Sequence, residues 1–198
     1  MESIRSFIAI ELPDSLKDEL LRLESELKQA AGTDCARWVA PSGIHLTLKF
    51  LGNVSAGQID EIKQAMERAC RGIPPFQLGI TNPGAFPSLR RVQIVWVGMG
   101  GELETLQQLV KQLESELGGL GFAGEPRPFT PHLTLARIRN NAAPASRQHL
   151  GELLDKTHVH IKSPISVAAI SLMKSELTHG GAIYSRIYAT ALKAEDKQ

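Results

Sequence analysis

The chain contains the same four residues, His-Leu-Thr-Leu, at two separate places, beginning at His45 and at His132. Each copy supplies an imidazole and a hydroxyl group two positions apart. Histidine has an unperturbed pKa of about 6.5, so one imidazole can accept a proton while another donates one near neutral pH. The hydroxyls of Thr47 and Thr134 can donate hydrogen bonds to an anionic group. The two copies together therefore predict an acid–base site built around an anion.

Such a site suits the opening of a phosphodiester, in which one histidine activates water and the other protonates the departing oxygen. Each proton transfer of this kind typically contributes about a hundred- to ten-thousandfold in rate. The rival interpretation is a metal site. The motifs lack the carboxylates that magnesium prefers, and His-x-Thr offers no good third ligand for zinc. A lone histidine in a strand is more often a packed residue, so the repetition is what favours catalysis.

The first motif lies in an expected strand at 44–52, where side chains alternate between two faces. Alternation places His45, Thr47 and Lys49 on one face. The motif leucines and Phe50 fall on the opposite face, which we expect to be buried. Lys49 therefore has the right parity to add positive charge to the site, and Phe50 is expected to pack in the core.

The second motif lies in an expected strand at 132–139. Here alternation places His132 and Thr134 on one face and Arg137 on the other. Arginine is well shaped to bind a phosphate group. Arg137 is therefore a candidate phosphate ligand only if the end of the strand turns it toward His132; otherwise it is a surface residue.

The elements around the motifs predict an α+β fold with largely antiparallel sheets, because short turns join many of the strands. Apolar residues recur at helical spacing in several segments, and residues 82–88 look like a turn between two strands. No linker separates two domains, so residues 1–198 are expected to form a single two-lobed domain, and the repeated motif suggests internal duplication. The expected helices are 14–31, 55–72, 101–119 and 144–155, and the expected strands are 6–12, 37–40, 44–52, 76–80, 91–99, 132–139 and two or three within 158–192.

The bulk composition is that of a globular protein without a long nucleic-acid surface. The net charge is +1, so contact with RNA is expected to involve a few phosphates. Cys35 and Cys70 have no zinc-type spacing and fit a reducing compartment. The apolar run near the N-terminus is too short for a signal peptide or a membrane span. We therefore expect a cytoplasmic protein without a membrane partner. A monomer is expected, since no exposed interface pattern stands out in the sequence.

Three stretches carry a resemblance to a known family: "RSFIAIELP" at 5–13, "RWVAPSGIHLTLKFLG" at 37–52 and "RPFTPHLTLAR" at 127–137. They resemble the two-histidine (2H) phosphoesterase superfamily. Within it they resemble the bacterial and archaeal RNA 2',3'-cyclic phosphodiesterases, formerly called 2'-5' RNA ligases. The resemblance covers nearly the whole chain. It implies a two-lobed α+β fold with pseudo-twofold-related antiparallel sheets, flanking helices and a central cleft.

The resemblance also implies an activity. It is the hydrolysis, without metal or cofactor, of a terminal RNA 2',3'-cyclic phosphate to a 2'-phosphomonoester, with a capacity for 2'-5' ligation of RNA such as tRNA halves in the reverse sense. Carried over, His45 donates a proton to the leaving 3'-oxygen and His132 accepts one from water. Thr47 and Thr134 hold the phosphate oxygens, and Arg137 follows the second motif as in the family.

Two alternatives stay open at this stage. One is a hydrolase of another small cyclic phosphate, such as a 2',3'-cyclic nucleotide or ADP-ribose 1'',2''-cyclic phosphate. The other is a nucleotide-binding module without turnover. Because the two motifs are identical, the residues alone also leave open which histidine is the acid and which the base.

Overall fold

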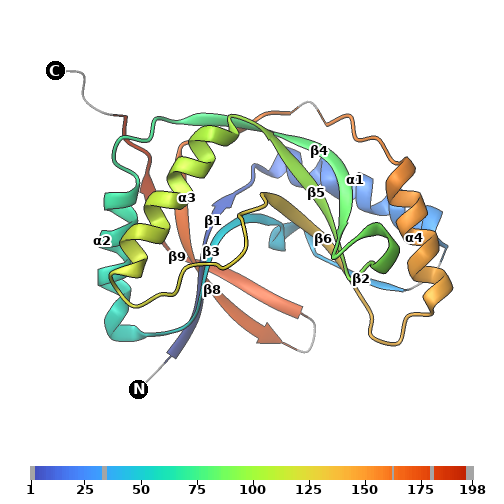
Figure 1. Ribbon diagram of the computed structural model, residues 1–198, viewed down its shortest axis with the longest axis horizontal. Coiled ribbons are helices and arrows are strands. Elements are labelled where there is room, and N and C mark those ends of the chain that lie inside the picture. Colours follow the sequence, from blue (N-terminus) through green and yellow to red (C-terminus); the bar gives the residue numbers. More distant parts are fainter. Residues whose placement is uncertain (1–2, 33–34, 162, 179–180, 195–198) are drawn as a thin grey trace.

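Two antiparallel sheets and the helices that flank them make up the computed structural model, which describes residues 3–32, 35–161, 163–178 and 181–194 (Figure 1). Sheet A has the strand order β3-β1-β8-β9, and sheet B has the order β2-β6-β5-β4-β7. All pairings between these strands are antiparallel, as the α+β prediction required. The strands are β1 (Ser3–Glu11), β2 (Ala36–Trp38), β3 (His45–Ser55), β4 (Phe76–Phe86), β5 (Ile94–Gly101), β6 (His132–Ile138), β7 (Ile165–Val167), β8 (Ala169–Thr178) and β9 (Gly181–Ala191).

The two sheets repeat one arrangement. The order β3-β1-β8-β9 matches β6-β5-β4-β7, with β2 as an addition beside β6. Each sheet takes strands from both halves of the chain, so the lobes are interleaved in sequence. The motif strands β3 and β6 contact each other where the two lobes meet. After β2, a short 3-10 helix at Pro41–Gly43 carries the chain from sheet B into β3 of sheet A.

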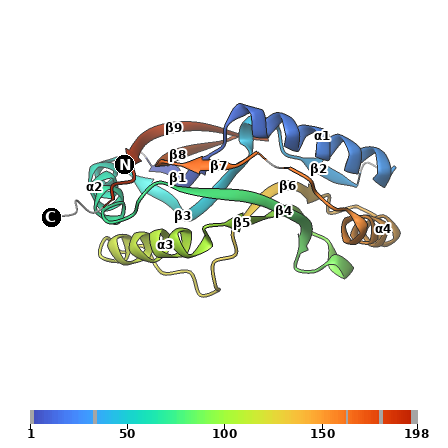
Figure 2. The same ribbon diagram turned by 90° about the horizontal axis from the view of Figure 1, so that it is seen from above.

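The helices are α1 (Asp14–Ala31), α2 (Ile59–Ala69), α3 (Leu103–Gly118) and α4 (Pro144–Lys156). Helix α2 packs against α3 at one end of the molecule, and α1 packs against α4 at the other (Figure 2). Helix α1 has the bounds expected from its leucine spacing, and Gly32 ends it in the left-handed conformation that glycine adopts without strain. Among the described residues, no helix is long and apolar enough to cross a lipid bilayer.

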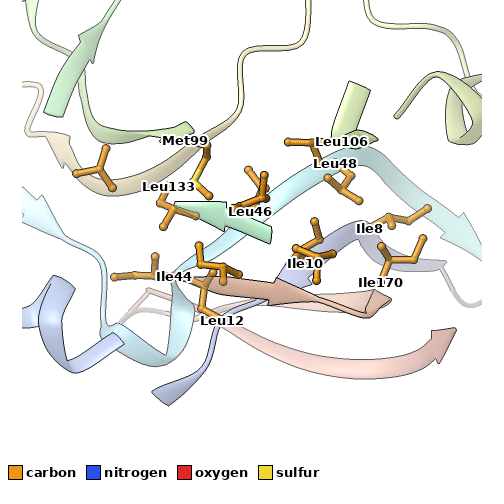
Figure 3. Packing of buried hydrophobic residues seen from close by; sticks show 14 of the residues in the cluster. Ile8, Ile10, Leu12, Ile44, Leu46, Leu48, Met99, Leu106, Leu133 and Ile170 are labelled. Atoms are coloured by element: carbon orange, nitrogen blue, oxygen red, sulfur yellow. The ribbon is translucent and has the colours of Figure 1, made fainter. Parts of the chain in front are cut away.

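One core runs behind both motif strands. Leu46 and Leu48 of β3 and Leu133 of β6 lie in it beside residues of β1, β5, β8 and α3 (Figure 3). These leucines are at most 4% exposed. Burying a leucine side chain typically contributes about 1.5–3 kcal/mol. The leucines therefore hold each motif strand in place, and each motif's histidine and threonine remain on the other face.

The turn expected at 82–88 is wrong, because β4 continues through this segment to Phe86. A register shift between Ile80 and Pro83 takes up the irregular residues as a bulge. Pro83 is tolerated there because β7 pairs only with the start of β4 and leaves this part of the strand as an edge. Gly84 has its own role, since a Cβ atom at that position would come 2.4 Å from the Trp96 ring that lies over it.

Candidate active site

Both motif histidines are held by the same contact. The Nδ1 atom of His45 lies 2.8 Å from the carbonyl oxygen of Gly43, and that of His132 lies 2.7 Å from the carbonyl oxygen of Thr130. A carbonyl oxygen only accepts hydrogen bonds, so Nδ1 carries the hydrogen in each ring. In each ring Nε2 is then left for chemistry, as a lone pair when the imidazole is neutral and as a donor when it is charged. The same nitrogen can therefore serve as base in one copy and as acid in the other.

A β-bulge interrupts the first motif strand. Ile8 of β1 pairs with Lys49, and the next residue, Ala9, pairs with Thr47. Leu48 is therefore an extra residue without a partner on β1. A bulge of this kind moves the following residues to the opposite face of the sheet. Leu48 and Lys49 are accordingly both buried, although they are neighbours in a strand.

The second motif strand carries the same bulge at the same motif position. Val95 of β5 pairs with Ala136, and Trp96 pairs with Thr134, so Leu135 is the extra residue. Leu135 and Ala136 are both buried as a result. The fourth residue of each HLTL motif is thus the bulged residue, and the two sheets share this irregularity as well as their strand order.

The bulge overturns the prediction for Lys49. Its side chain is buried away from the motif face, with the residue only 3% exposed. The Nζ atom donates to the two carboxylate oxygens of Glu114 at 2.9 and 2.8 Å and to the carbonyl oxygen of Ala123 at 2.6 Å. Lys49 therefore joins β3 to α3 and supplies no charge to the histidines.

The bulge also reverses the expectations for Phe50 and Arg137. Phe50 is 60% exposed, so the prediction that it packs in the core is wrong. Arg137 is exposed and pairs with Ile94, on the face that carries His132 and Thr134. Phe50 and Arg137 occupy equivalent positions of the two motifs. Nothing in either stretch of sequence signals the bulge, because register is a property of two paired strands.

Arg137 borders a surface pocket. Gln93, Ile94, Ile138, Asn140 and Arg147 line the same hollow, which has a volume of about 420 Å³. The guanidinium of Arg147 donates to backbone carbonyls, including that of Arg139 at 3.0 Å from Nη2. Arg147 is therefore occupied with holding the loop after β6. Of these two arginines, Arg137 is the one that lies on the motif face.

Aromatic rings surround His45. Its imidazole stacks on Phe7 with ring centroids 4.6 Å apart, and Tyr184 meets it edge-on at 5.0 Å. Burial by this packing lowers the pKa of His45, while the hydrogen bond to the Gly43 carbonyl and the charge of Glu11 act in the opposite direction. Glu11 is the residue of β1 that pairs with His45.

Different aromatic rings pack against His132. Phe86 of β4 meets its ring edge-on at 4.9 Å, and Trp96 of β5 lies at 6.3 Å. The residue of β5 that pairs with His132 is Gly98. Neighbours such as Glu11, Tyr184 and Phe86 could not be found from the sequence, because they come from strands distant along the chain and reach the histidines only through pairing.

The structure therefore divides the predicted site residues between two contacting strands. His45 and Thr47 lie on β3, and His132, Thr134 and Arg137 lie on β6. Both threonines are partly exposed beside their histidines. Within the described part of the chain, no three His, Cys, Asp or Glu side chains gather in a group that could hold a metal ion. The side chains on this face offer proton transfer and hydrogen bonding.

Comparison with known proteins also divides the chain into two similar halves. The model of the LigT like Phosphoesterase family matches the chain twice, at residues 10–96 and 97–184. The two matches begin 87 residues apart, and His132 follows His45 by the same 87 positions. The internal duplication suggested by the repeated motif is thus present along the whole matched region.

Named relatives and solved structures agree with that match. The RNA 2',3'-cyclic phosphodiesterase of Methanothermobacter thermautotrophicus is 34% identical over 182 residues, covering 92% of this chain and 95% of the relative. The enzyme of the same name from Escherichia coli is 33% identical over 142 residues, covering 71% and 76%. The structure of Escherichia coli LigT complexed with 3'-AMP has a TM-score of 0.74 at 27% identity, covering 96% of this chain and 99% of the other. The chain belongs to the LigT-like phosphoesterase family.

Proposed function

We propose that the protein hydrolyses terminal RNA 2',3'-cyclic phosphates to 2'-phosphomonoesters, with His45 as proton donor and His132 as proton acceptor. The observation that carries the proposal is the pair of histidines on the contacting strands β3 and β6, each held through Nδ1 so that Nε2 is left for chemistry. The relatives named RNA 2',3'-cyclic phosphodiesterase supply the substrate class.

The reaction balances without a further reactant. Neutral His132 takes a proton from water at Nε2 while the water oxygen attacks phosphorus. The bond between phosphorus and the 3'-oxygen breaks, and His45 gives the proton on its Nε2 to that oxygen. The product has a 2'-phosphate and a free 3'-hydroxyl. Exchange of protons with solvent then returns His45 to its charged form and His132 to its neutral form.

Three further side chains support the phosphate in this scheme. Thr47 and Thr134 donate hydrogen bonds to its non-bridging oxygens, where negative charge builds during attack. Arg137 lies on the face of His132 and stabilises the same charge from the β6 side. With the 5'-hydroxyl of another RNA in place of water, the same acid and base would form a 2'-5' bond and account for ligation.

The protein is proposed to act as a cytoplasmic monomer in which both lobes of residues 1–198 work as one catalytic unit. The division of the site between β3 and β6 supports this proposal, because neither lobe alone carries both histidines. Cys35 and Cys70 are free and buried, which suits a reducing compartment.

The experiment that tests the function is hydrolysis of a short RNA with a 2',3'-cyclic phosphate end, in excess EDTA. Phosphorus NMR identifies the product isomer. We expect a 2'-phosphate, and we expect His45→Ala and His132→Ala each to lower kcat by at least about a hundredfold, the usual contribution of one proton transfer. A bell-shaped dependence of kcat/KM on pH is expected, because one imidazole must be charged and the other neutral.

His160→Ala is the control, because His160 is exposed and lies outside the two motif strands. This variant should retain wild-type turnover. A 3'-phosphate product would contradict the assignment of leaving group. Near-normal turnover by either motif variant would remove that histidine from the chemistry.

A second candidate is hydrolysis of small cyclic nucleotides. Structures of Escherichia coli LigT complexed with 3'-AMP and with ATP favour it, since both ligands are mononucleotides. Values of kcat/KM for a 2',3'-cyclic mononucleotide and for an oligonucleotide with the same 3'-terminal base separate the two. A clear preference for the mononucleotide would make it the better substrate assignment.

A further inference from the structure

The two motifs are identical in sequence, but the residues that face their histidines across the sheet differ in charge. Glu11 of β1 pairs with His45, whereas Gly98 of β5 pairs with His132. These two positions are equivalent, because β1 and β5 hold the same place in the two sheets. Residues directly opposite each other in an antiparallel pair have Cα atoms about 4.5–5.5 Å apart. The Glu11 carboxylate is therefore a near neighbour of His45.

The carboxylate of Glu11 is held in place by two donors. Ser171 Oγ of β8 donates to Oε1 at 2.5 Å, and Arg186 Nη1 of β9 donates to the same oxygen at 3.2 Å. Arg186 is largely exposed, at 59% of its side chain, so the pair lies at the solvent edge of the site. The negative charge of Glu11 thus has a fixed position beside β3.

The corresponding position in the other sheet is closed to a carboxylate. A Cβ atom at Gly98 would come 2.4 Å from Thr81 Oγ1. A side chain there would require the Thr81 side chain of β4 to move. The negative charge at one histidine and its absence at the other are therefore both built into the sheets.

We infer that Glu11 is a positioning residue that gives His45 the role of acid in the reaction proposed above. The inference rests on that proposed function. A fixed carboxylate stabilises a neighbouring imidazolium and leaves a neutral imidazole unaffected. A donor must be charged when the substrate arrives, and an acceptor must be neutral. Glu11 favours the first state at His45, and Gly98 leaves His132 free to adopt the second.

The other groups that face His45 make this charge necessary. Phe7 of β1 and Tyr184 of β9 pack their rings against the imidazole, and the Gly43 carbonyl occupies Nδ1. Arg186 is the charged neighbour of opposite sign, and it acts on the carboxylate. Burial is the larger effect and holds the pKa of His45 below its ordinary value, while the Gly43 carbonyl and the Glu11 charge raise it. Without Glu11, less of the enzyme would hold His45 in its charged form.

The test is an NMR titration of the two imidazoles together with the pH profile of kcat/KM. Glu11→Gln keeps an oxygen that can accept from Ser171 but removes the charge. We expect the titration midpoint of His45 to fall and that of His132 to stay. Values of kcat/KM should fall several-fold above neutrality, where charged His45 becomes scarcer, and should change little below pH 6.

Two other variants make the result specific. Arg186→Gln removes the cation that offsets Glu11, so it should move the His45 midpoint in the opposite direction. Glu176→Gln removes an exposed carboxylate from β8 that is paired with Lys174, and it should move neither midpoint. A loss of fold would instead disturb both imidazoles together.

The inference is overturned if Glu11→Gln leaves the His45 midpoint unchanged, or if it raises kcat/KM below pH 6 and leaves kcat/KM unchanged above neutrality. The second result would make His45 the base while leaving the proposed hydrolysis intact. A wild-type protein that does not hydrolyse the cyclic phosphate would remove the proposed function, and this inference with it.

Discussion

The two helices that stand in equivalent places, α1 after β1 and α3 after β5, carry the same five residues, LESEL, at 23–27 and 113–117. The first glutamate of each copy has a different environment. Glu114 forms a salt bridge with the buried Lys49. Glu24 is buried, and its Oε1 atom has no hydrogen-bond partner among the residues that the structure describes. Burial alone raises the pKa of Glu24 to about 8.

The motif strands explain this difference. Lys49 follows the first HLTL motif directly, and the residue that follows the second is Ala136. Both positions come immediately after the bulge and point into the core. Ala136, at the motif position equivalent to Lys49, carries no charge that could pair with a carboxylate. The strands, bulges and helices thus recur in both lobes, whereas among the described residues the ion pair between lysine and glutamate forms only at Lys49.

The largest effect expected from this comparison is that of Glu114→Gln on stability. The substitution leaves the ammonium of Lys49 buried with a weaker acceptor. Removing one partner of a buried pair typically costs about 3–5 kcal/mol, so we expect a loss of about 4 kcal/mol. Urea unfolding at pH 7 measures it. A loss below about 1 kcal/mol would mean that Lys49 does not depend on this carboxylate.

The same substitution at Glu24 should change the free energy of unfolding in the opposite direction and stabilise the protein. The pKa of Glu24 is about 8 in the folded protein and 4.5 as its ordinary value. The unfolded chain therefore releases this proton first as the pH rises, and the wild type loses stability through that window. Glutamine cannot ionise. We expect Glu24→Gln to unfold like the wild type near pH 4.5 and to be more stable by about 3 kcal/mol at pH 7.

Urea unfolding of wild type and Glu24→Gln across this pH range measures the difference. Glu114→Gln serves as the matched control, since it makes the same chemical change in the equivalent helix. If both variants lost stability to the same extent at pH 7, Glu24 would have a partner equivalent to Lys49, and the two lobes would not differ in this way.

Alternation and spacing were sufficient to predict the α+β class, the motif strands and the full length of α1. They could not predict the register of paired strands. The bulge after Thr47 and Thr134 decides that Lys49 is buried and that Phe50 and Arg137 reach the motif face, and it depends on contacts with β1 and β5. The repeat of LESEL is visible in the sequence. Whether its first glutamate has a cation as partner depends on tertiary contacts that the repeat does not reveal.

The smallest effects are expected where the bulge exposes different side chains at equivalent positions. Phe50 is an apolar ring on the face of Thr47, with its centroid 6.2 Å from that of Phe7. An exposed ring so close to the site can stack with the base of the substrate, which is typically worth about 1–3 kcal/mol. Arg137 offers a charge that any phosphate can use.

Phe50→Leu and Arg137→Gln should therefore differ in which substrates they affect. We expect Phe50→Leu to raise KM by about tenfold for a ribonucleoside 2',3'-cyclic phosphate, which corresponds to about 1.4 kcal/mol. It should leave KM unchanged for glycerol 1,2-cyclic phosphate, which has no base to stack. Arg137→Gln should lower kcat/KM for both substrates alike, because both carry the phosphate. Steady-state kinetics on the two substrates measure both differences.

Equal effects of Phe50→Leu on both substrates would mean that the ring shapes the face near Thr47. An effect of Arg137→Gln on the nucleotide alone would mean that the guanidinium contacts the base. Either result would contradict the expectation that Phe50 on β3 contacts the base of the substrate and Arg137 on β6 contacts its phosphate.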